Sequence, residues 1–498
     1  MMAKSWWLSS AGQLGLILIL AGCLRLYRIT NPIADWHAFR QADTASVTRE
    51  FVKHGVDLLR PTYLDHSNIQ TGKDNPQGYR LVEFPIINGG TAVILRALPE
   101  LPLELTSRLA SVVLSLIAIA ALYGLVMDLS GKNLAFWSAL TMAVLPYSIY
   151  YSRVVLPEPG LLASSLISLW AYQKYLQRPQ LGWWLLSLIA LALAFLLKPF
   201  VVFLAPVFIG LALQHRGWKI LKSFDLLILA GLAIWPFIAW RKWIMTFPTG
   251  IPASDWLLNG NGIRFRPAWF RWLFWERITK LILGGTGAIF GVMNLFHLPN
   301  WRTHQRWSQD WLIYAAWWLG MLIYLSVIAT GNVQHDYYQV FLLPIICITL
   351  ARGLLWASNQ LHQFWPNWPI WLGVSLGLLI SVLGSWHWVG GYFNVNHWEY
   401  VEAGQVVNQL TPVEAQVIAP AFGDTIFLFQ TNRTGWPIGF EIDKKISLGA
   451  DYYITTSYDD EARELEQKFE TVVKTEKYLL LNLTQPIATA SAKNMLTP

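Results

Sequence analysis

A short stretch near the N-terminus holds the side chains best suited to chemistry. Residues 35–44 read DWHAFRQADT, which places two carboxylates, an imidazole and a guanidinium directly after an apolar segment. Ionisable groups beside a bilayer are costly unless they pair or act on a ligand. Asp43 is therefore our first candidate for a general base or a metal ligand, and Asp35 is the second.

Both aspartates also have structural interpretations. Asp35 precedes a helical stretch, where its carboxylate would serve as an N-cap for exposed backbone N–H groups. Asp43 lies one turn beyond Arg40 and would pair with Arg40 or Arg49. The spacing i, i+3, i+4, i+7 puts several polar groups on one helix face, which fits a ligand site or a solvated helix. These residues are His37, Arg40, Gln41 and Thr44.

Further polar clusters occur far along the chain. Glu83 precedes a short apolar segment, and Glu158 stands between two prolines at the start of another. Glu158 can also be a plain carboxylate at a helix N-terminus, where the helix dipole favours negative charge. A late cluster consists of His335, Asp336 and Tyr337. We predict that these clusters meet with Asp43 in a single extracytoplasmic cavity.

Basic residues complement these acids. Lys198 lies between two apolar segments, and arginines interleaved with tryptophans crowd the stretch before residue 281. Such residues either bind anionic lipid headgroups or clamp the phosphate of a lipid-linked substrate. The residues assigned to the clamp are Lys198, Arg264, Arg266 and Arg271. The sequence lacks a Walker loop, a GxGxxG turn, HExxH and CxxC, so nucleotide-driven and structural-zinc chemistry lose support.

Composition places all of these residues on a membrane protein. Of 498 residues, 54% are hydrophobic and only 13% are charged, about half the charged fraction of a soluble protein. The net charge of +7 then reports topology and anionic ligands rather than nucleic acid. Apolar runs near the length needed to cross a bilayer predict about eleven spans. They cover residues 8–26, 105–127, 134–151, 161–176, 181–197, 200–213, 226–243, 281–296, 311–330, 340–357 and 369–389.

The short apolar segment 84–98 decides the predicted topology. It contains Asn88 and two glycines, and at about 15 residues it is too short to cross, so we interpret it as a juxtamembrane or re-entrant helix. The loops rich in Lys and Arg then share the cytoplasmic side with the N-terminus, as the positive-inside rule requires. These loops are 128–133, 173–180, 214–223, 300–309 and 352–367. The first loop, 28–104, and the C-terminus lie outside.

Charge returns and long apolar runs stop near residue 390. We therefore predict a membrane domain over 1–390 and an extracytoplasmic α/β domain over 391–498. The pattern predicts helices at 399–410 and 459–474, and strands at 416–419, 425–430, 452–455 and 478–483.

The order of these motifs resembles the GT-C membrane glycosyltransferases, in particular the bacterial family-39-type branch related to protein O-mannosyltransferases and the aminoarabinose transferase of lipid A. The resemblance covers roughly the first 360 residues. It rests on segments 37–45, 83–85, 108–111, 156–159 and 335–338 with Pro344, and on Arg433–Trp436 in the outer domain. Many members carry Asp-Glu where this chain has Arg40-Gln41, and Asp where it has Glu158. This leaves open which carboxylate is catalytic.

The resemblance implies transfer of one sugar, a hexose or a pentose, from a polyprenyl-phosphate carrier to a hydroxyl acceptor on a lipid, glycan or protein. Asp43, Asp35 or Glu158 would take the acceptor proton, and Arg and Lys with His37 or His335 would stabilise the departing phosphate. No cofactor is assigned with certainty, and a divalent cation would be held by Asp43 and Glu158. The enzyme would act at the outer face of the inner (plasma) membrane. Alternatives are an oligosaccharide ligase or polymerase, a transporter or flippase for lipid-linked glycans, and a non-catalytic scaffold.

Overall fold

The chain folds into two compact units. The computed structural model describes residues 9–222, 224–294 and 309–487. The first unit, called the helical unit here, combines Met1–Ile29, Arg108–Lys242 and Ser254–Phe393. The second, the α/β unit, combines Thr30–Ser107, Trp243–Ala253 and Asn394–Pro498.

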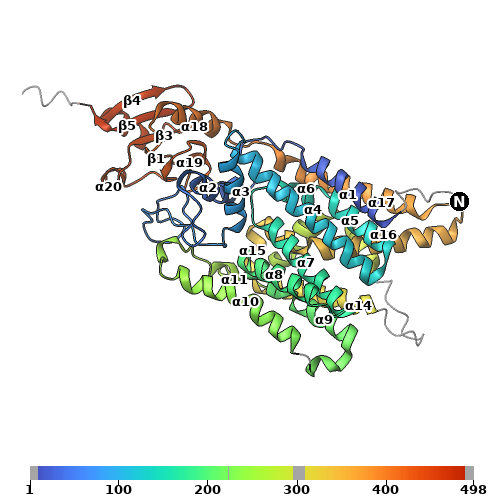
Figure 1. Ribbon diagram of the computed structural model, residues 1–498. Coiled ribbons are helices and arrows are strands. Elements are labelled where there is room, and N and C mark those ends of the chain that lie inside the picture. The colour runs from blue at the N-terminus through green and yellow to red at the C-terminus, as the bar shows by residue number, and fades with distance from the viewer. Residues whose placement is uncertain (1–8, 223, 295–308, 488–498) are drawn as a thin grey trace, which may run out of the picture. The chain divides into compact units, whose positions relative to one another are not determined.

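The helical unit follows from long runs of apolar residues, which must satisfy their backbone groups internally. Its first half contains α1 (Ser10–Arg25), α4 (Leu103–Ser130), α5 (Lys132–Val144), α6 (Pro146–Arg153), α7 (Glu158–Gln177), α8 (Leu181–Leu197), η2 (Pro199–Leu204), α9 (Ala205–Arg216), η3 (Gly217–Lys222) and α10 (Asp225–Ile244). Its second half contains α11 (Trp256–Asn259), α12 (Pro267–Phe270), the π-helix η5 (Arg271–Ile282), α13 (Thr286–Met293), α14 (Gln309–Val327), α15 (Ala329–Gln334), η7 (Asp336–Leu342), α16 (Leu343–Phe364), α17 (Ile370–Val389) and η8 (Gly390–Phe393). Helix α16 packs against α5 and α17, and α7 packs against α8 (Figure 1).

Fewer helices qualify as membrane spans than the apolar runs predict. Within the described residues, six helical stretches are long and apolar enough to cross a membrane, or up to seven if α6 and α7, bent by 107°, form one broken span. The predicted spans at 8–26 and 181–197 form helices shorter than 18 residues. The predicted span at 134–151 divides into α5 and α6 because Pro146 has no N–H to continue the first helix. The end of the span at 281–296, and most of the loop at 300–309, lie outside the described residues.

A buried arginine shows how the helical unit satisfies charge in an apolar setting. Arg25 is fully buried, and its guanidinium donates to Ser115 Oγ at 3.0 Å and to the Ala143 carbonyl at 3.0 Å. The Arg25 guanidinium also approaches Ser148 Oγ at 3.3 Å. It therefore ties α1 to α4 and to the break between α5 and α6, where backbone carbonyls lack helical partners.

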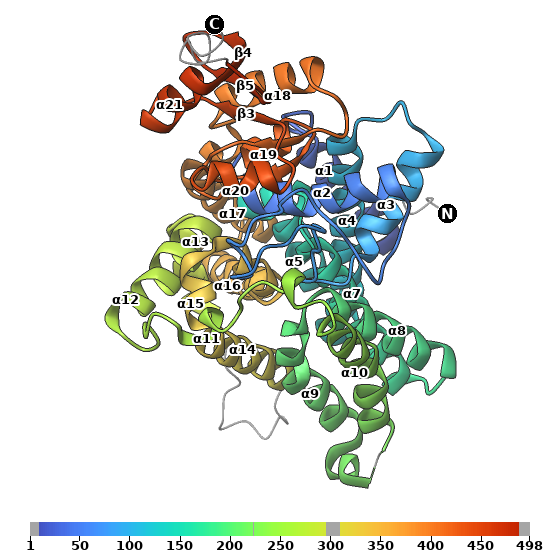
Figure 2. The same ribbon diagram turned by 90° about the vertical axis from the view of Figure 1, so that its left-hand side faces the viewer.

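The α/β unit is built on a five-stranded mixed sheet (Figure 2). The strand order is β2-β1-β3-β5-β4, with β1 parallel to β2 and β3, and with β5 antiparallel to β3 and β4. The strands are β1 (Gln416–Ile418), β2 (Thr434–Trp436), β3 (Tyr452–Thr455), β4 (Phe469–Lys474) and β5 (Leu479–Pro486). The helices are α2 (Ala38–His54), α3 (Ile86–Ala97), η4 (Pro248–Gly250), α18 (Trp398–Leu410), α19 (Ile426–Gln430), α20 (Ile442–Ser447) and α21 (Asp460–Lys468).

The first outer loop extends this sheet. Asp65 forms a parallel bridge with Gly435, the His66 N–H donates to the Gly435 carbonyl at 2.8 Å, and the Gly435 N–H donates to the Leu64 carbonyl at 2.9 Å. Gly435 has φ +148°, and an added Cβ would lie 2.0 Å from the Val417 carbonyl oxygen, so only glycine fits there. The loop covers the edge of β2 that would otherwise present unpaired backbone groups.

Most predicted elements of the C-terminal segment are confirmed, and two are wrong. Residues 425–430 form helix α19 rather than a strand. The run is short and apolar, a pattern that does not distinguish a strand from a buried helix. The predicted helix 459–474 ends at Lys468, and the β-branched residues that follow form β4.

Candidate functional site

In the α/β unit, Asp43 is the centre of a buried polar network. Its carboxylate is 1% exposed and lies 2.8 Å from Nη2 of Arg80. Gln70 Nε2 donates to Asp43 Oδ2 at 3.1 Å, and Thr425 Oγ1 donates to Asp43 Oδ1 at 2.7 Å. Both carboxylate oxygens therefore have donors, as a buried charge requires.

The arginines predicted to pair with Asp43 have other partners. Arg40 forms an ion pair with Glu83, with Nη2 to Oε1 at 2.5 Å. Arg49 donates to the Phe429 carbonyl at 2.9 Å and lies over the Phe429 ring at 4.5 Å. The prediction was wrong because spacing along one helix does not reveal which loop packs against it.

The start of α2 also differs from its prediction. The helix begins at Ala38, and its N-cap is His37, which has φ 54° in the left-handed region and makes no side-chain capping bond. Asp35 is not the cap: it is 2% exposed and accepts a hydrogen bond from Gln41 Nε2 at 2.7 Å. The His37 ring contacts the Trp36 ring at 5.2 Å. A left-handed conformation at a non-glycine residue is strained and clusters at functional sites.

A second carboxyl beside Asp43 escaped the sequence analysis. Burial raises the pKa of Asp424 to about 6, the Ile426 N–H counteracts this, and the negative charge of Asp43 adds to the rise. The two groups lie in sequence segments about 380 residues apart, so no local motif marks them as a pair. A carboxyl with a pKa of about 6 is half protonated at about pH 6 and can act as a proton donor in mildly acidic solution.

In the helical unit, Glu158 and Lys198 form a buried ion pair. Their side chains are 3% and 8% exposed, and Lys198 Nζ lies 2.5 Å from Glu158 Oε1. The ammonium lies 5.4 Å from the ring centroid of Tyr337 and 5.0 Å from that of Tyr338. Within the described residues, the buried Glu158 Oε2 has no hydrogen-bond partner. This oxygen can accept a proton, or a hydrogen bond that a ligand donates.

Breaks between helices bring this pair together. Glu158 begins α7 just after the 107° bend from α6, with proline on both sides. Lys198 separates α8 from η2 and is followed by Pro199. The two tyrosines lie in the 3-10 helix η7, which contacts α7. Prolines end the helices here, so ionisable side chains stand where backbone groups also lack helical partners.

A second buried carboxylate, Asp336, anchors η7. Tyr151 Oη donates to it at 2.5 Å, Tyr392 Oη donates at 2.6 Å, and Nη1 of Arg277 lies 3.6 Å away. Asp336 follows His335, whose ring stacks on that of Tyr337 at 5.3 Å. Tyr151 and Tyr392 were missed because nothing in their local sequence relates them to Asp336.

The predicted arginine clamp is differently placed. Arg264 Nη2 donates to the carbonyls of Leu258 and Val327 at 3.1 and 3.2 Å. Arg266 and Arg271 are exposed, and Nε of Arg271 lies 3.7 Å from Glu276. Arg264 therefore holds backbone, and a shared role of the three in binding phosphate stays a prediction.

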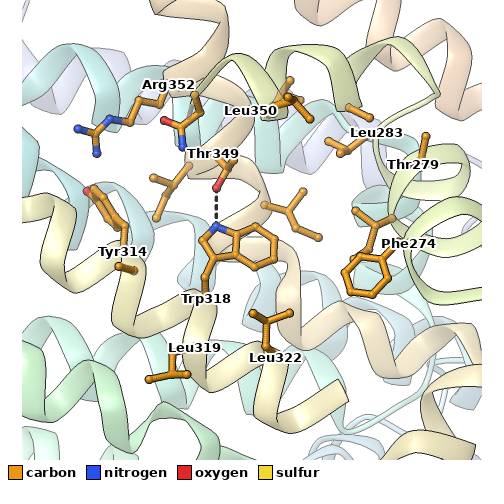
Figure 3. Close-up of a pocket in the computed structure, with 18 of the residues that line it drawn as sticks. Phe274, Thr279, Leu283, Tyr314, Trp318, Leu319, Leu322, Thr349, Leu350 and Arg352 are labelled. Carbon is orange, nitrogen blue, oxygen red and sulfur yellow. Dashed lines mark hydrogen bonds between the residues drawn. The ribbon is translucent and has the colours of Figure 1, made fainter. Parts of the chain in front are cut away.

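The helical unit also contains an apolar cavity of about 600 Å³ between η5, α13, α14 and α16. Figure 3 shows Phe274, Trp318 and Leu322 on its walls, with Arg352 at one end. Trp318 Nε1 donates to Thr349 Oγ1 at 3.0 Å, the bond drawn dashed in Figure 3. Such a cavity suits an apolar chain rather than a sugar.

No group of three or more His, Cys, Asp or Glu side chains able to hold a metal occurs in the part of the chain that the structure describes. The prediction that Asp43 and Glu158 hold a cation stays a prediction, as does the meeting of the two acidic clusters in one cavity.

Comparisons with known proteins bear on the fold and the class of the protein. The family model for dolichyl-phosphate-mannose-protein mannosyltransferases matches residues 100–243, which include both Glu158 and Lys198. No curated protein sequence shows significant similarity to the chain. The fold is that of the GT-C membrane glycosyltransferases, as the sequence predicts.

Two solved structures illustrate the shared fold. ArnT from Cupriavidus metallidurans, bound to undecaprenyl phosphate, superposes with a TM-score of 0.66 at 13% identity, covering 95% of this chain and 98% of that one. The oligosaccharyltransferase of Archaeoglobus fulgidus superposes with a TM-score of 0.56 at 12% identity, covering 91% of this chain and 70% of that one. With the family model, they support an integral membrane protein of the glycosyltransferase class.

Proposed function

We propose that this protein transfers one sugar, a hexose or a pentose, from a polyprenyl-phosphate carrier to a hydroxyl acceptor. The observation that carries the proposal is the Glu158–Lys198 pair, buried at 2.5 Å within the segment that the mannosyltransferase family model matches. The ArnT structure contains undecaprenyl phosphate, and an archaeal oligosaccharyltransferase structure contains dolichol phosphate. Both are polyprenyl-type phosphates, which supports a donor of the same chemistry here.

The proposed reaction is a displacement at the anomeric carbon. An acceptor hydroxyl forms a bond to that carbon while the bond to the phosphate oxygen breaks, and polyprenyl phosphate leaves. The hydroxyl proton passes to a carboxylate, for which Glu158, Asp43 and Asp35 are the candidates. Oε2 of Glu158 has no partner among the described residues, which favours Glu158, because its proton acceptance disturbs no hydrogen bond seen there.

Cationic groups then oppose the charge that grows on the departing phosphate. Lys198 is suited to this role because the buried ammonium acts in a site of low dielectric constant. We assign substrate contacts to His335 and to the rings of Tyr337 and Tyr338 around it. Binding roles for His37, Arg40, Gln41 and Glu83, for Asp336, and for the arginines Arg264, Arg266 and Arg271, complete the proposed set.

We further propose that the enzyme lies in the inner (plasma) membrane with a cytoplasmic N-terminus and an extracytoplasmic C-terminal segment. The basic loops between the apolar runs support this orientation. It places the α/β unit on the side where a lipid-linked sugar would meet an envelope acceptor.

Transfer of labelled sugar from synthetic polyprenyl phosphates tests the proposal. Membranes that contain the protein, incubated with hexose- and pentose-loaded carriers, should label lipid, glycan or protein. The combined substitution Asp43→Asn, Asp35→Asn and Glu158→Gln should abolish the labelling, whereas Asp57→Asn, at an exposed carboxylate, should not. Labelling that survives the triple substitution contradicts the proposed site. Transfer only from a pyrophosphate-linked oligosaccharide would favour a ligase instead.

A further inference from the structure

A polar pocket in the α/β unit lies outside the residues discussed so far. It has a volume of about 370 Å³ and is lined by side chains from α2, from the first outer loop and from the C-terminal segment. The charged and aromatic lining residues are Glu50, Lys53, His54, Tyr63, His66 and Glu414. Thr62, Thr434 and Gln77 add hydroxyl and amide groups, and Val413 adds an apolar side chain.

Glu50 gives the pocket an unsatisfied acceptor. The side chain is 6% exposed, and its Oε1 is buried without a hydrogen-bond partner in the described part of the chain. The other oxygen, Oε2, lies 3.4 Å from Nε2 of His54. An unpaired buried carboxylate oxygen is unfavourable, so a hydroxyl or ammonium donor entering the pocket would gain a strong hydrogen bond.

The other groups suit a ligand with many hydroxyls. Burial lowers the pKa of His66, so its imidazole is neutral at pH 7 and can both donate and accept. Lys53 supplies donors, whereas the hydroxyl groups of Thr62 and Thr434 supply both donors and acceptors. The lining is mixed in charge, which disfavours a simple phosphate site and favours a neutral or amino-bearing polyol.

The pocket is also connected to the Asp43 network. Glu50 lies seven residues after Asp43 on α2, which puts both on nearly the same helix face, separated by about 10 Å along the axis. Tyr63, which lines the pocket, stacks under the Arg80 guanidinium at 4.9 Å, and Arg80 in turn pairs with Asp43.

We propose that this pocket binds a saccharide ring of the acceptor. This inference rests on the proposed function only in assigning the saccharide to the acceptor. Binding of a saccharide in the pocket does not depend on the transfer reaction. Glu50 accepts hydrogen bonds from ring hydroxyls, and His66 with the two threonines orients the ring.

Direct binding tests the proposal without any transfer reaction. The full-length protein, in a detergent without a sugar headgroup, is titrated with glucose, galactose, mannose and glucosamine, and saturation-transfer NMR detects binding. At least one of these probes should bind, and Glu50→Gln should weaken that binding at least tenfold. Asp57→Asn serves as the matched control, because Asp57 follows α2 but is exposed and pairs with Arg60. It should leave the affinity unchanged.

A second variant removes any ambiguity about folding. Gln77 is exposed at the pocket, so Gln77→Trp should block the pocket without disturbing buried packing, and it should also abolish binding. The proposal is overturned if none of the four probes binds, or if Glu50→Gln and Gln77→Trp bind as the wild type does. Binding that persists in a protein inactive in sugar transfer would overturn the proposed function and leave this site supported.

Discussion

The buried carboxylates of the two acidic clusters are stabilised in different ways. In the α/β unit, both oxygens of Asp43 accept hydrogen bonds, and Arg80 neutralises the charge. In the helical unit, Glu158 has one oxygen paired with Lys198 and the other unpartnered within the described residues. A carboxylate with every acceptor filled stabilises its surroundings, whereas one with a free buried oxygen retains capacity for a proton or a ligand.

The elements that carry the two acids also differ in how regular their backbone is. Asp43 lies in the interior of a continuous helix and is held by side chains from loops. Glu158 stands at a 107° break between helices, where the chain itself is irregular. Irregular backbone inside a membrane protein is tolerated where it lines a cavity. The break before Glu158, and the Glu158 oxygen that has no partner among the described residues, both favour a ligand site there. This difference favours Glu158 over Asp43 as the proposed base.

The largest expected effect is the loss of transfer activity in Glu158→Gln. The amide keeps the size of the side chain but cannot take the acceptor proton, so activity should fall by about 10³-fold or more. Transfer of labelled sugar in proteoliposomes, at saturating donor, measures the effect on kcat.

A second ion pair of the helical unit provides the control. Lys174 Nζ lies 2.8 Å from Asp128, also partly buried, but at the other end of α7. Asp128→Asn breaks a similar pair far along the helix and should keep activity within a few-fold of wild type. Equal losses in both variants would mean that the helical unit merely needs its ion pairs, and the comparison would fail.

The next effect concerns stability in the α/β unit. Asp43→Asn leaves the Arg80 guanidinium buried without its counter-charge and should destabilise the unit by about 3 kcal/mol. Arg80→Met should relieve much of this loss, so the double variant should be more stable than the sum of the single losses predicts. Denaturant unfolding of the purified protein, followed for all four members of the cycle, measures the coupling. Additive losses of stability would show that the ion pair with Arg80 does not stabilise the Asp43 carboxylate.

The elements of both units could largely be predicted, because their cause is local. Continuous apolar runs produced the helices of the helical unit, and the strands β1, β3 and β5 follow from short apolar runs, aromatic and β-branched in β3 and leucine-rich in β5. Proline explains where the long runs break, as at Pro146 and Pro199. The need for glycine at position 435, by contrast, is evident only from the structure, because a Cβ there would collide with the backbone of the neighbouring strand β1.

The candidate site was only partly predictable, since its contacts are between distant segments. The sequence singled out Glu158 and Lys198 separately, but nothing local marks them as partners across 40 residues. The partner of Asp43 was predicted on its own helix and proved to be Arg80. Thr425 donates to Asp43 from 382 residues away and was assigned to a strand that does not exist. Residue types predict chemistry, whereas pairing needs tertiary structure.

A pH-dependent effect should be specific to the α/β unit. Burial raises the pKa of Asp65 to about 6 from its ordinary 3.8, although hydrogen bonds from Ser67 and Tyr63 counteract the rise. The folded protein then binds a proton more tightly than the unfolded one. The contribution of Asp65 to stability is therefore greatest below about pH 4 and decreases as the pH rises from about 4 to about 6. Asp65→Asn removes this dependence. The free energy of unfolding of the variant, relative to that of wild type, should therefore be up to about 3 kcal/mol higher at pH 7 than at pH 4.

Unfolding curves at pH 4 and pH 7 in the same detergent measure the difference between the two proteins. Asp57→Asn is the control, because that carboxylate is exposed and lies outside the buried network of Asp65. An Asp65→Asn variant whose difference from wild type is equal at both pH values would show that Asp65 is ionised normally.

The smallest effect tests the aromatic surroundings that distinguish the Glu158 site from the Asp43 site. The Tyr338 ring faces the Lys198 ammonium at 5.0 Å, an arrangement worth about 1 kcal/mol in a buried setting. Tyr338→Leu keeps an apolar side chain but loses the ring, so activity should fall about fivefold, whereas Tyr338→Phe keeps the ring and should remain near wild type. Rates of sugar transfer at saturating donor separate the two variants. If phenylalanine is as harmful as leucine, the hydroxyl rather than the ring is required, and Lys198 is held by Glu158 much as Arg80 is held by Asp43.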